Sequence, residues 1–568
     1  MCLMGHCEVS RSRRLCMPRY WRVLDRLASV RPVAQIGAAI GRQFPYALLR
    51  AVSSLPEDEL QGSLAHLVAS ELVSQRGAPP EAVYSFKHAL VQDAAHGSLL
   101  RSSRQQLHAQ IAEALEAHSP ELMDSQPEIF AQHYAEAGLV EKSVAYWGKA
   151  GHRSATRSAM AEAAAQFQKG LDQLALLSDT RERRRQELEL RSSLGTVLLH
   201  GKGEAAAETG EAYARARQLW EQLGSPPEFL RIPFAQSLYH GMRGQFDLAL
   251  RLNEDLLRLS RQHNNTEGLI LAHLSLGFNL RNAGRFVRSR SHLEEVLRCY
   301  DPALHPSLVH QAGDDPHVDA EAFLGSVLFC LGFPNQALAR VKSANSEATR
   351  LAHPPSLAVS LSASALVLSL VNDHAALNEL ADQLVTLATE QDFPLYRAAG
   401  ITYRGWVGVK NGDVAQGISL LRSGSTAYQA TGAEVQMPRF IGLLAGACEI
   451  AGQFDESLVL LEVALQTAER TGARWFTAEL NRQKGQMLLR QGDTEAAEEL
   501  YRKALSIAQD QEAKLWELRT AVSLARLRRD QGRSIEARDL LAPVYSWFTE
   551  GFDTPDLKEA KALLDELG

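Results

Sequence analysis

Apolar residues recur along most of this chain with the spacing of amphipathic α-helices, and short glycine turns interrupt them at regular intervals. Each turn has the pattern Gly-polar-x and precedes an alanine-rich helix. The turns begin at Gly244, Gly284, Gly332, Gly412, Gly452, Gly492 and Gly532. Four of the six spacings between them are 40 residues; one is 48 and one is 80. The spacing of 80 predicts a degenerate copy near Asn372 and Asp373.

A small residue follows each of these glycines at the fifth position. The small residues are Ala249, Ser289, Ala337, Gly417, Ser457, Ala497 and Ala537. A glycine ends one helix in the left-handed conformation, and a small side chain lets the axis of the next helix approach closely. Such helix pairs cannot bury their apolar faces alone, so neighbours must stack. We therefore predict an all-α, right-handed superhelical solenoid over residues 101–568, with a concave face that binds a partner.

One copy resembles the tetratricopeptide repeat in detail. Gly485, Ala497, Tyr501 and Ala504 occupy the places where that repeat has its small, small, aromatic and small residues. The period of 40 residues exceeds the usual value of about 34, and the closing proline is absent. Each helix is therefore expected to be about one turn longer than usual. An irregular helical bundle is the alternative, which the constant spacing disfavours.

Residues 24–100 follow a different pattern, which predicts a small winged-helix domain. Three helices are expected first, and two short β-like runs joined by a Gly-Pro turn follow them. The predicted helices are 24–40, 46–52 and one that opens at Leu55-Pro56-Glu57, and the predicted strands are 71–75 and 82–86. The third helix would be the recognition helix. It is acidic where it begins and has neither Lys nor Arg through His66, so DNA binding is not expected.

Two segments of this region, VAQIGAAIGRQFPYALL at 33–49 and YSFKHALVQDAAHGSLL at 84–100, resemble the winged-helix region of bacterial STAND-type signalling ATPases. An adenylate/guanylate cyclase domain often precedes the ATPase in those proteins, and tetratricopeptide-like repeats follow it. The chain's last segment, Leu541–Leu567, resembles the terminus of the same family. The resemblance covers residues 24–568 and implies the carboxy-terminal half of such a protein.

The resemblance also implies one site residue. In the family, the histidine of a His-Asp pair in the winged helix meets the nucleotide phosphate in the resting state. His88 is the corresponding residue, but Ala89 stands where the pair has Asp. His88 would therefore contact a nucleotide only if an ATPase domain is present. The alternative is that His88 simply begins and caps the next helix.

Catalytic motifs are missing from the sequence. It contains no Gly-x4-Gly-Lys-Ser/Thr loop, and its two Gly-Lys pairs, Gly148-Lys149 and Gly201-Lys202, are interpreted as turns. Residues 1–23 match neither pattern and are expected to be a disordered leader. A start site or frameshift that separates the chain from its ATPase would explain them. Zinc binding by Cys2, His6, Cys7 and Cys16 is disfavoured by their spacing.

Composition and charge limit the kinds of partner and the cellular compartment that we expect. The net charge of −7 gives no general attraction to nucleic acid or anionic membranes. The most apolar stretch, Leu357–Val371, is too short to cross a bilayer and is predicted to be a buried helix. Cys299, Cys330 and Cys448 stand alone in helical sequence, as is typical of a reducing compartment. We expect a cytoplasmic protein that needs neither cofactor nor membrane.

Three further groups of residues are candidates for chemistry. The first contains His305, His310, Asp314, Asp315 and His317, and is interpreted as a solvated loop in preference to a metal site. The second comprises the basic runs Arg181–Arg185 and Arg519–Arg533, which are interleaved with acids and predict exposed helix faces. The third comprises Trp147, Trp406, Trp475 and Trp516, which are expected mostly in the core, with one or two lining the concave face.

These observations predict a non-catalytic sensor and interaction arm of a cyclase-linked STAND-type ATPase. Its partner would be a protein or peptide on the concave face, or a small-molecule inducer. Binding would be relayed through the winged helix to a nucleotide-binding ATPase or cyclase domain, in cis or in trans. The alternatives are a fragment of a transcription activator, an enzyme with its site in the groove, and a free-standing repeat scaffold.

Overall fold

The computed structural model describes residues 29–157 and 159–568. The chain divides into two compact units between Leu194 and Gly195, within one long helix. The first unit contains a small sheet with helices around it and then a series of helix pairs; the second is entirely helical among its described residues. No helix in the described part of the chain is long and apolar enough to span a membrane.

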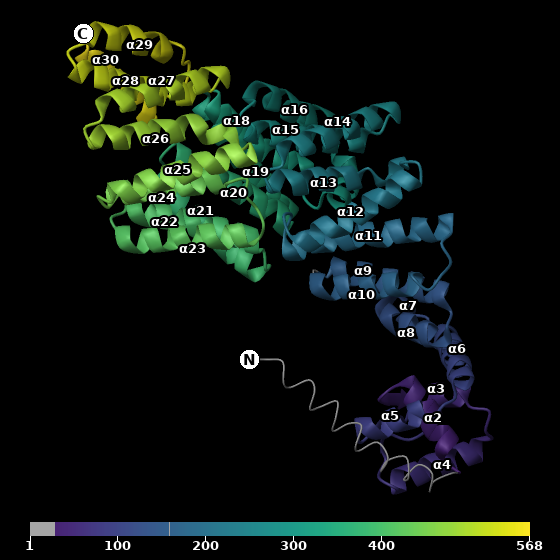
Figure 1. Cartoon of the computed structure of the whole chain (residues 1–568). Helices are drawn as coiled ribbons and strands as arrows, with labels where there is room; N and C mark the ends of the chain where they lie inside the picture. The colour runs from purple at the N-terminus through teal and green to yellow at the C-terminus, as the bar shows by residue number, and fades with distance from the viewer. Residues whose placement is uncertain (1–28, 158) are drawn as a thin grey trace. The chain divides into compact units, whose positions relative to one another are not determined.

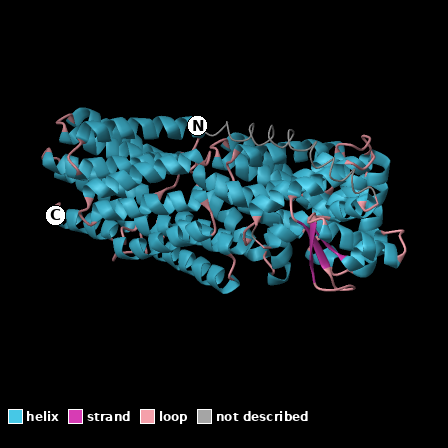
Figure 2. Ribbon diagram, turned by 90° about the horizontal axis from the view of Figure 1, so that it is seen from below, coloured by secondary structure: helices cyan, strands magenta, loops and turns pink. Residues whose placement is uncertain are grey.

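In its described part, the first unit begins with four helices and three strands. They are α2 (Arg31–Ile40), β1 (Gln43–Pro45), α3 (Tyr46–Val52), α4 (Glu57–Ala69), β2 (Val73–Arg76), β3 (Val83–Phe86) and α5 (Ala89–Gly97). The strands, magenta in Figure 2, form one antiparallel sheet in the order β1-β3-β2. Phe44 of β1 pairs with Tyr84, and Val73 of β2 pairs with Phe86. Phe44, Tyr84 and Phe86 are buried together with Leu49 and Leu64 in one core.

The predicted hairpin and the helix at 46–52 are confirmed. The first helix differs from the prediction, because α2 begins at Arg31 with Pro32 in its first turn, where proline is favoured. Residues 24–28, part of the predicted helix, lie outside the described residues, as does the predicted leader at 1–23. Strand β1 was not predicted. Its three residues carry too short a pattern, and it exists because β3 offers a second edge to pair with.

Helices alone complete the first unit. They are α6 (Arg101–His118), α7 (Leu122–Ser125), α8 (Pro127–Ala137), α9 (Val140–Thr156), α10 (Met160–Leu174) and the first part of α11 (Arg181–Lys202). Gly148 lies inside α9, and Gly201 lies in the last turn of α11. The interpretation of both Gly-Lys pairs as turns was therefore wrong.

The second unit consists of helix pairs joined by short turns (Figure 1). After the end of α11, the elements are α12 (Ala207–Gln222), η1 (Pro227–Phe229), α13 (Arg231–Met242), α14 (Phe246–Gln262), α15 (Thr266–Asn282), α16 (Phe286–Cys299), η2 (Pro302–Leu304), α17 (His305–Ala312), α18 (Pro316–Cys330), α19 (Pro334–Leu351), α20 (Pro354–Leu370), α21 (His374–Glu390), α22 (Pro394–Lys410), α23 (Val414–Ala430), α24 (Met437–Ile450), α25 (Phe454–Thr471), η3 (Arg474–Phe476), α26 (Thr477–Arg490), α27 (Thr494–Asp510), α28 (Lys514–Asp530), α29 (Ser534–Ser546) and α30 (Pro555–Glu566).

The glycine pattern is confirmed as the origin of these pairs. All seven repeat glycines have φ between 72° and 101°, the left-handed region that favours glycine. The small residues that follow them are all buried. The predicted degenerate copy is the turn between α20 and α21, where Asn372 has φ 60° and the Asp373 side chain accepts a hydrogen bond from the amide of Ala376. The buried helix predicted at 357–371 is α20.

Within the second unit the array winds back onto itself. The Gly244 turn packs against Thr471 at the end of α25, and the Gly284 turn packs against Gln511 at the end of α27. In both contacts the two residues are separated by the same number of positions along the chain. Successive helix pairs of one winding therefore lie against successive pairs of the next. The amides of Glu434 and Val435 donate to the carbonyl of Met242 at 2.8 and 3.1 Å and add a backbone link. The first helices of the pairs therefore face an enclosed interior.

The segment interpreted as a solvated loop is instead part of this interior. Asp314 and Asp315 are buried, and Asp315 accepts a hydrogen bond from the amide of Val318 as the N-cap of α18. Tyr300 donates to Asp315 at 2.8 Å, and its ring contacts His317. The side chains of His305 and His310 lie outside what the structure describes. The prediction was wrong because the winding of the array places other helices over this segment.

Candidate binding groove

A groove of about 820 Å³ runs along the last helix pairs of the second unit. Nearly all of its lining residues belong to the first helix of a pair, from α20 to α30. Two rows of lining residues recur at the repeat period. One row is Trp406, Gly446, Gln486 and Arg526, and the other is Lys410, Ile450, Arg490 and Asp530. The groove therefore repeats one helix face at successive steps of the array, as the period predicts for a concave surface.

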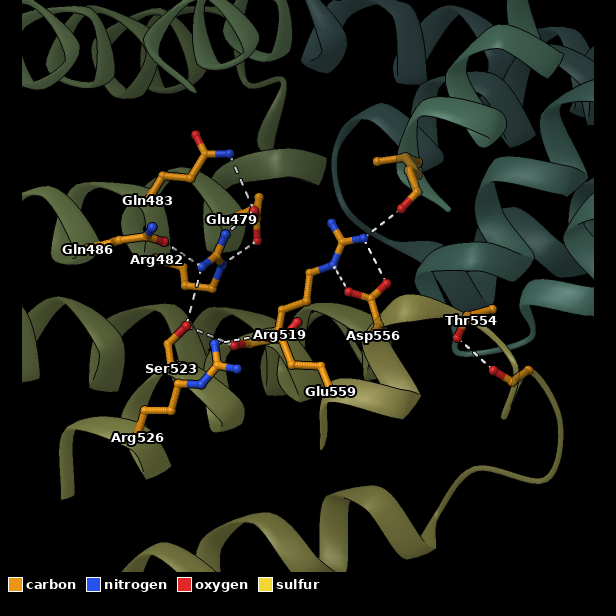
Figure 3. Close-up of polar contacts among 12 residues, drawn as sticks. Glu479, Arg482, Gln483, Gln486, Arg519, Ser523, Arg526, Thr554, Asp556 and Glu559 are labelled. Carbon is orange, nitrogen blue, oxygen red and sulfur yellow. Dashed lines mark hydrogen bonds and ion pairs between the residues drawn. The ribbon is translucent and has the colours of Figure 1, made fainter. Parts of the chain in front are cut away.

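Arg519 ties three helices together at the floor of the groove (Figure 3). Its guanidinium donates to both carboxylate oxygens of Asp556 on α30, at 2.7 and 2.8 Å. It also donates to the carbonyl of Leu370, at 2.6 Å, in the last turn of α20. A cation is favoured there because helix carbonyls carry partial negative charge at that end. Arg519 was expected on an exposed face, and this was wrong: its side chain is only 15% exposed.

A second charged network continues along α26 and α28. Arg482 donates to both oxygens of Glu479, at 2.8 and 2.6 Å, and also to Gln486 and Ser523 (Figure 3). Burial would raise the pKa of Glu479, but the charge and hydrogen bonds of Arg482 outweigh it and leave that pKa below its ordinary value. Arg526 and Glu559 form a further ion pair. The groove thus presents both signs of charge, held in fixed pairs.

Three lining atoms of the groove have no hydrogen-bond partner within the described chain. They are two donors, Nε1 of Trp406 and Nε of Arg439, and one acceptor, Oε1 of Gln483. Arg439 is only 1% exposed, and its other nitrogens donate to Tyr403 and Ser369. Buried polar atoms without partners are costly and uncommon in folded proteins. All three atoms are covered by neighbouring groups, so a ligand with both carbonyl and N–H groups would satisfy them once the lining side chains move.

The predicted site residue His88 lies elsewhere. It is exposed at the N-terminus of α5, where its carbonyl accepts from the amide of Val91 at 3.0 Å. Its side chain makes no capping hydrogen bond, so it begins the helix without capping it. Whether it contacts a nucleotide stays a prediction.

A chain of histidines links α5, α6 and α8 in the first unit. Nε2 of His96 lies 3.1 Å from Nε2 of His108, and Nδ1 of His108 lies 2.8 Å from Nδ1 of His133. Burial lowers the pKa of His108 to about 3 and that of His133 to about 4, so these rings are neutral. With Glu136, His96 and His108 offer ligand atoms within 4.8 Å of one another, the spacing a metal ion needs. All three residues already have a protein partner: the two histidines face each other, and Arg104 lies 3.7 Å from Glu136.

The tryptophans follow the prediction. Trp147, Trp475 and Trp516 are buried, whereas Trp406 lines the groove with Lys410 over its ring. Arg439 and Arg519 were not singled out as groove residues. The signal that could have found them is the repeat period itself, because Arg439, Glu479 and Arg519 are 40 residues apart and all line the groove.

Comparisons with known proteins agree with this architecture. Residues 439–510 and 476–546 match the tetratricopeptide repeat model. The helix pairs within these residues are therefore similar to tetratricopeptide repeats. Over 500 residues the chain is 24% identical to an uncharacterised protein of Rhizobium meliloti (strain 1021). That alignment covers 86% of the chain and 48% of the relative, so the chain spans about half the length of the curated relative it matches.

One solved structure to which the chain is similar is that of a Rap protein complexed with competence and sporulation factor. It is 12% identical, with a TM-score of 0.47, over 65% of this chain and 98% of that one. Another is the Cut9-Hcn1 hetero-tetramer of the APC/C. It is 12% identical, with a TM-score of 0.39, over 82% of this chain and 93% of that one.

Proposed function

We propose that the chain is the non-catalytic sensor and protein-interaction arm of a cyclase-linked STAND-type signalling ATPase. The groove along α20 to α30 binds a segment of a partner protein. The binding event is relayed through residues 24–100, as a winged-helix domain, to a nucleotide-binding domain in cis or in trans. The elements from α2 to α5, four helices with a three-stranded sheet, are followed by the repeats, and this order supports the assignment.

The observation that carries the proposal is the set of unpaired polar atoms in the groove. The N–H groups of Trp406 and Arg439 lack acceptors among the described residues, and the carbonyl of Gln483 lacks a donor. A peptide group offers one carbonyl and one N–H, so an extended segment satisfies donors and acceptors together. Nucleic acid supplies mainly acceptors and negative charge, which suits neither Gln483 nor the acids of the groove.

The charge pattern describes the partner further. Arg490 pairs with Glu449 at 3.0 Å, and Arg526 pairs with Glu559, so the rim is lined with internally compensated pairs. Lys410 has no carboxylate partner within ion-pair distance among the described residues. A bound segment that carries an acidic residue opposite Lys410 and otherwise mixed charges would complement this surface.

Selection of binding peptides from a displayed random library on the full chain tests the proposal. Trp406→Phe removes one N–H donor while keeping the ring. Loss of one hydrogen bond worth about 0.5–1.5 kcal/mol should weaken the selected peptides about three- to tenfold. Trp547→Phe is the matched control because Trp547 lies outside the groove, and it should change affinity less than twofold. Equal affinities for both variants and the wild type would refute groove binding.

A further inference from the structure

A cavity of about 110 Å³ lies deeper in the second unit, separate from the unpaired groove atoms described above. First helices of the earlier pairs, α13, α15, α18, α20 and α22, line it together with the start of α24. Its walls are mostly apolar and aromatic, with Phe234, Phe278, Phe323 and Phe440 among them. A cavity of this size holds the apolar body of a small ligand, one phenyl ring or a short alkyl chain.

Three acids gather on its wall, Glu204, Asp314 and Asp319, called here the cavity acids. Asp314 and Asp319 are 8% and 6% exposed. No arginine, lysine or histidine of the described chain forms an ion pair with any of the three. Burial is the main cause that raises the pKa of Glu204 to about 8 and that of Asp314 to about 7; repulsion by Asp314 adds to the first and repulsion by Asp315 to the second. Uncompensated buried acids are costly, and such groups concentrate at binding sites.

The unpaired atoms of the cavity show what is missing. Oδ1 of Asp319 and Oε1 of Gln436 both line it, and neither has a hydrogen-bond donor among the described residues. Both atoms are acceptors, so the complementary group must donate hydrogen bonds. A second cavity, of about 30 Å³, shares Glu204, Asp314 and Tyr396 with the first, so these residues stand between the two spaces.

Arg281 also lines the cavity, but its hydrogen bonds go to residues other than the cavity acids. Its nitrogens donate to Ser326 and Asn282, at 3.2 and 3.3 Å. Its guanidinium also lies between the rings of Phe278 and Phe323 at 5.2 and 5.1 Å. Arg281 therefore forms part of the wall and leaves the cavity acids uncompensated.

We propose that this cavity binds a small organic cation, a primary amine on an apolar ring or short chain. Its ammonium group lies against the cavity acids and donates to Asp319 and Gln436. Its apolar body fills the space between the aromatic walls, where the rings add cation–π attraction. The site does not depend on partner binding in the groove, so either can fail without the other.

The proposal is tested on the full chain by calorimetric titration with benzylamine, n-butylamine and phenethylamine. Each is paired with the alcohol that replaces the ammonium by a hydroxyl, and benzoate serves as the anion. At least one amine should bind with a Kd below 1 mM, its alcohol at least tenfold more weakly, and benzoate not at all. Failure of all three amines, or equal binding of an amine and its alcohol, would overturn the proposal.

Variants locate the site. Asp319→Asn keeps the shape of the side chain and removes the carboxyl group that would take the negative charge opposite the ammonium, so the fold is retained, as circular dichroism checks. It should weaken the binding amine at least tenfold. Asp413→Asn, an exposed matched control at the start of α23, should leave the affinity unchanged. Trp406→Phe should also leave it unchanged, which separates the cavity from the groove. Equal amine affinity in Asp319→Asn and the wild type would contradict the assignment.

Discussion

Replacing Arg519 with methionine tests whether the windings of the array are held together from within the groove. The substitution keeps an unbranched stem that still packs near the rings of Phe329 and Trp516, which Arg519 now covers at 5.7 and 5.2 Å. It removes the paired hydrogen bonds to Asp556 and the bond to the carbonyl of Leu370.

The expected loss follows from burial. The side chains of Arg519 and Asp556 are only 15% and 10% exposed, so methionine leaves Asp556 as an uncompensated charge in the interior. Breaking such a pair costs about 3–5 kcal/mol. Since each 1.4 kcal/mol is a factor of ten, amides that open with this network should exchange at least about a hundredfold faster.

Hydrogen exchange measured by mass spectrometry is the assay, because repeat arrays do not always unfold in one step. Protection should fall in α20 and α30 as well as in α28, although α20 is distant in sequence. Arg526→Met is the matched control on the same helix. The Arg526–Glu559 pair is 47% and 42% exposed, and such pairs contribute about 0–1 kcal/mol. Unchanged protection of α20 in Arg519→Met, or equal effects of the two variants, would refute the reasoning.

Three further outcomes are expected. Gly405→Ala should destabilise α22 by about 1–3 kcal/mol in a urea titration, because the added Cβ would lie 2.7 Å from the backbone of α23. Gly408→Ala in the same helix is the control: its Cβ would meet the nearest atom at 3.6 Å, so this variant should be neutral or slightly stabilising. The neutral histidines His108 and His133 have pKa values below the unfolded value of about 6.5, so the stability that they contribute is lost as pH falls. His108 alone should lower the exchange protection of α6 and α8 by about 3 kcal/mol between pH 6.5 and 4. Protection that does not change with pH would contradict this. The cavity acids have raised pKa values, so their contribution to stability is lost as pH rises from about 4 through 7 and 8. Asp319→Asn should therefore raise the melting temperature more at pH 8 than at pH 5. An equal increase at both pH values would show that ionisation of Asp319 does not destabilise the fold.

The helix pairs were predictable because their signal is local. A left-handed glycine and a small residue five positions later determine one turn and one close helix contact, and the period repeats both. Gly492 and Ala497 illustrate this, since the first has φ 88° and the second is fully buried. The groove follows from the same period, although the residues that line it become clear only when the first helices are aligned.

The buried charges were not predictable from local pattern. Arg519 stands in a run of alternating charges, which is typical of a solvated face, but its partners are a carboxylate on α30 and a carbonyl on α20. Asp314 stands among histidines and prolines, and its burial depends on helices of another winding. The spacing of residues within one segment does not determine which distant segment packs against it. Such residues were therefore interpreted as exposed when they are interior.

The most direct test of partner binding in the groove is a hydrogen-exchange footprint of a selected peptide on the full chain. We predict that added protection is concentrated in the first helices that line the groove, α20, α22, α24, α26, α28 and α30. The outer helix α25, which contributes no residue to the groove and carries the exposed Val459 and Val463, should be unchanged. Protection of this outer helix with none in the groove would contradict the account.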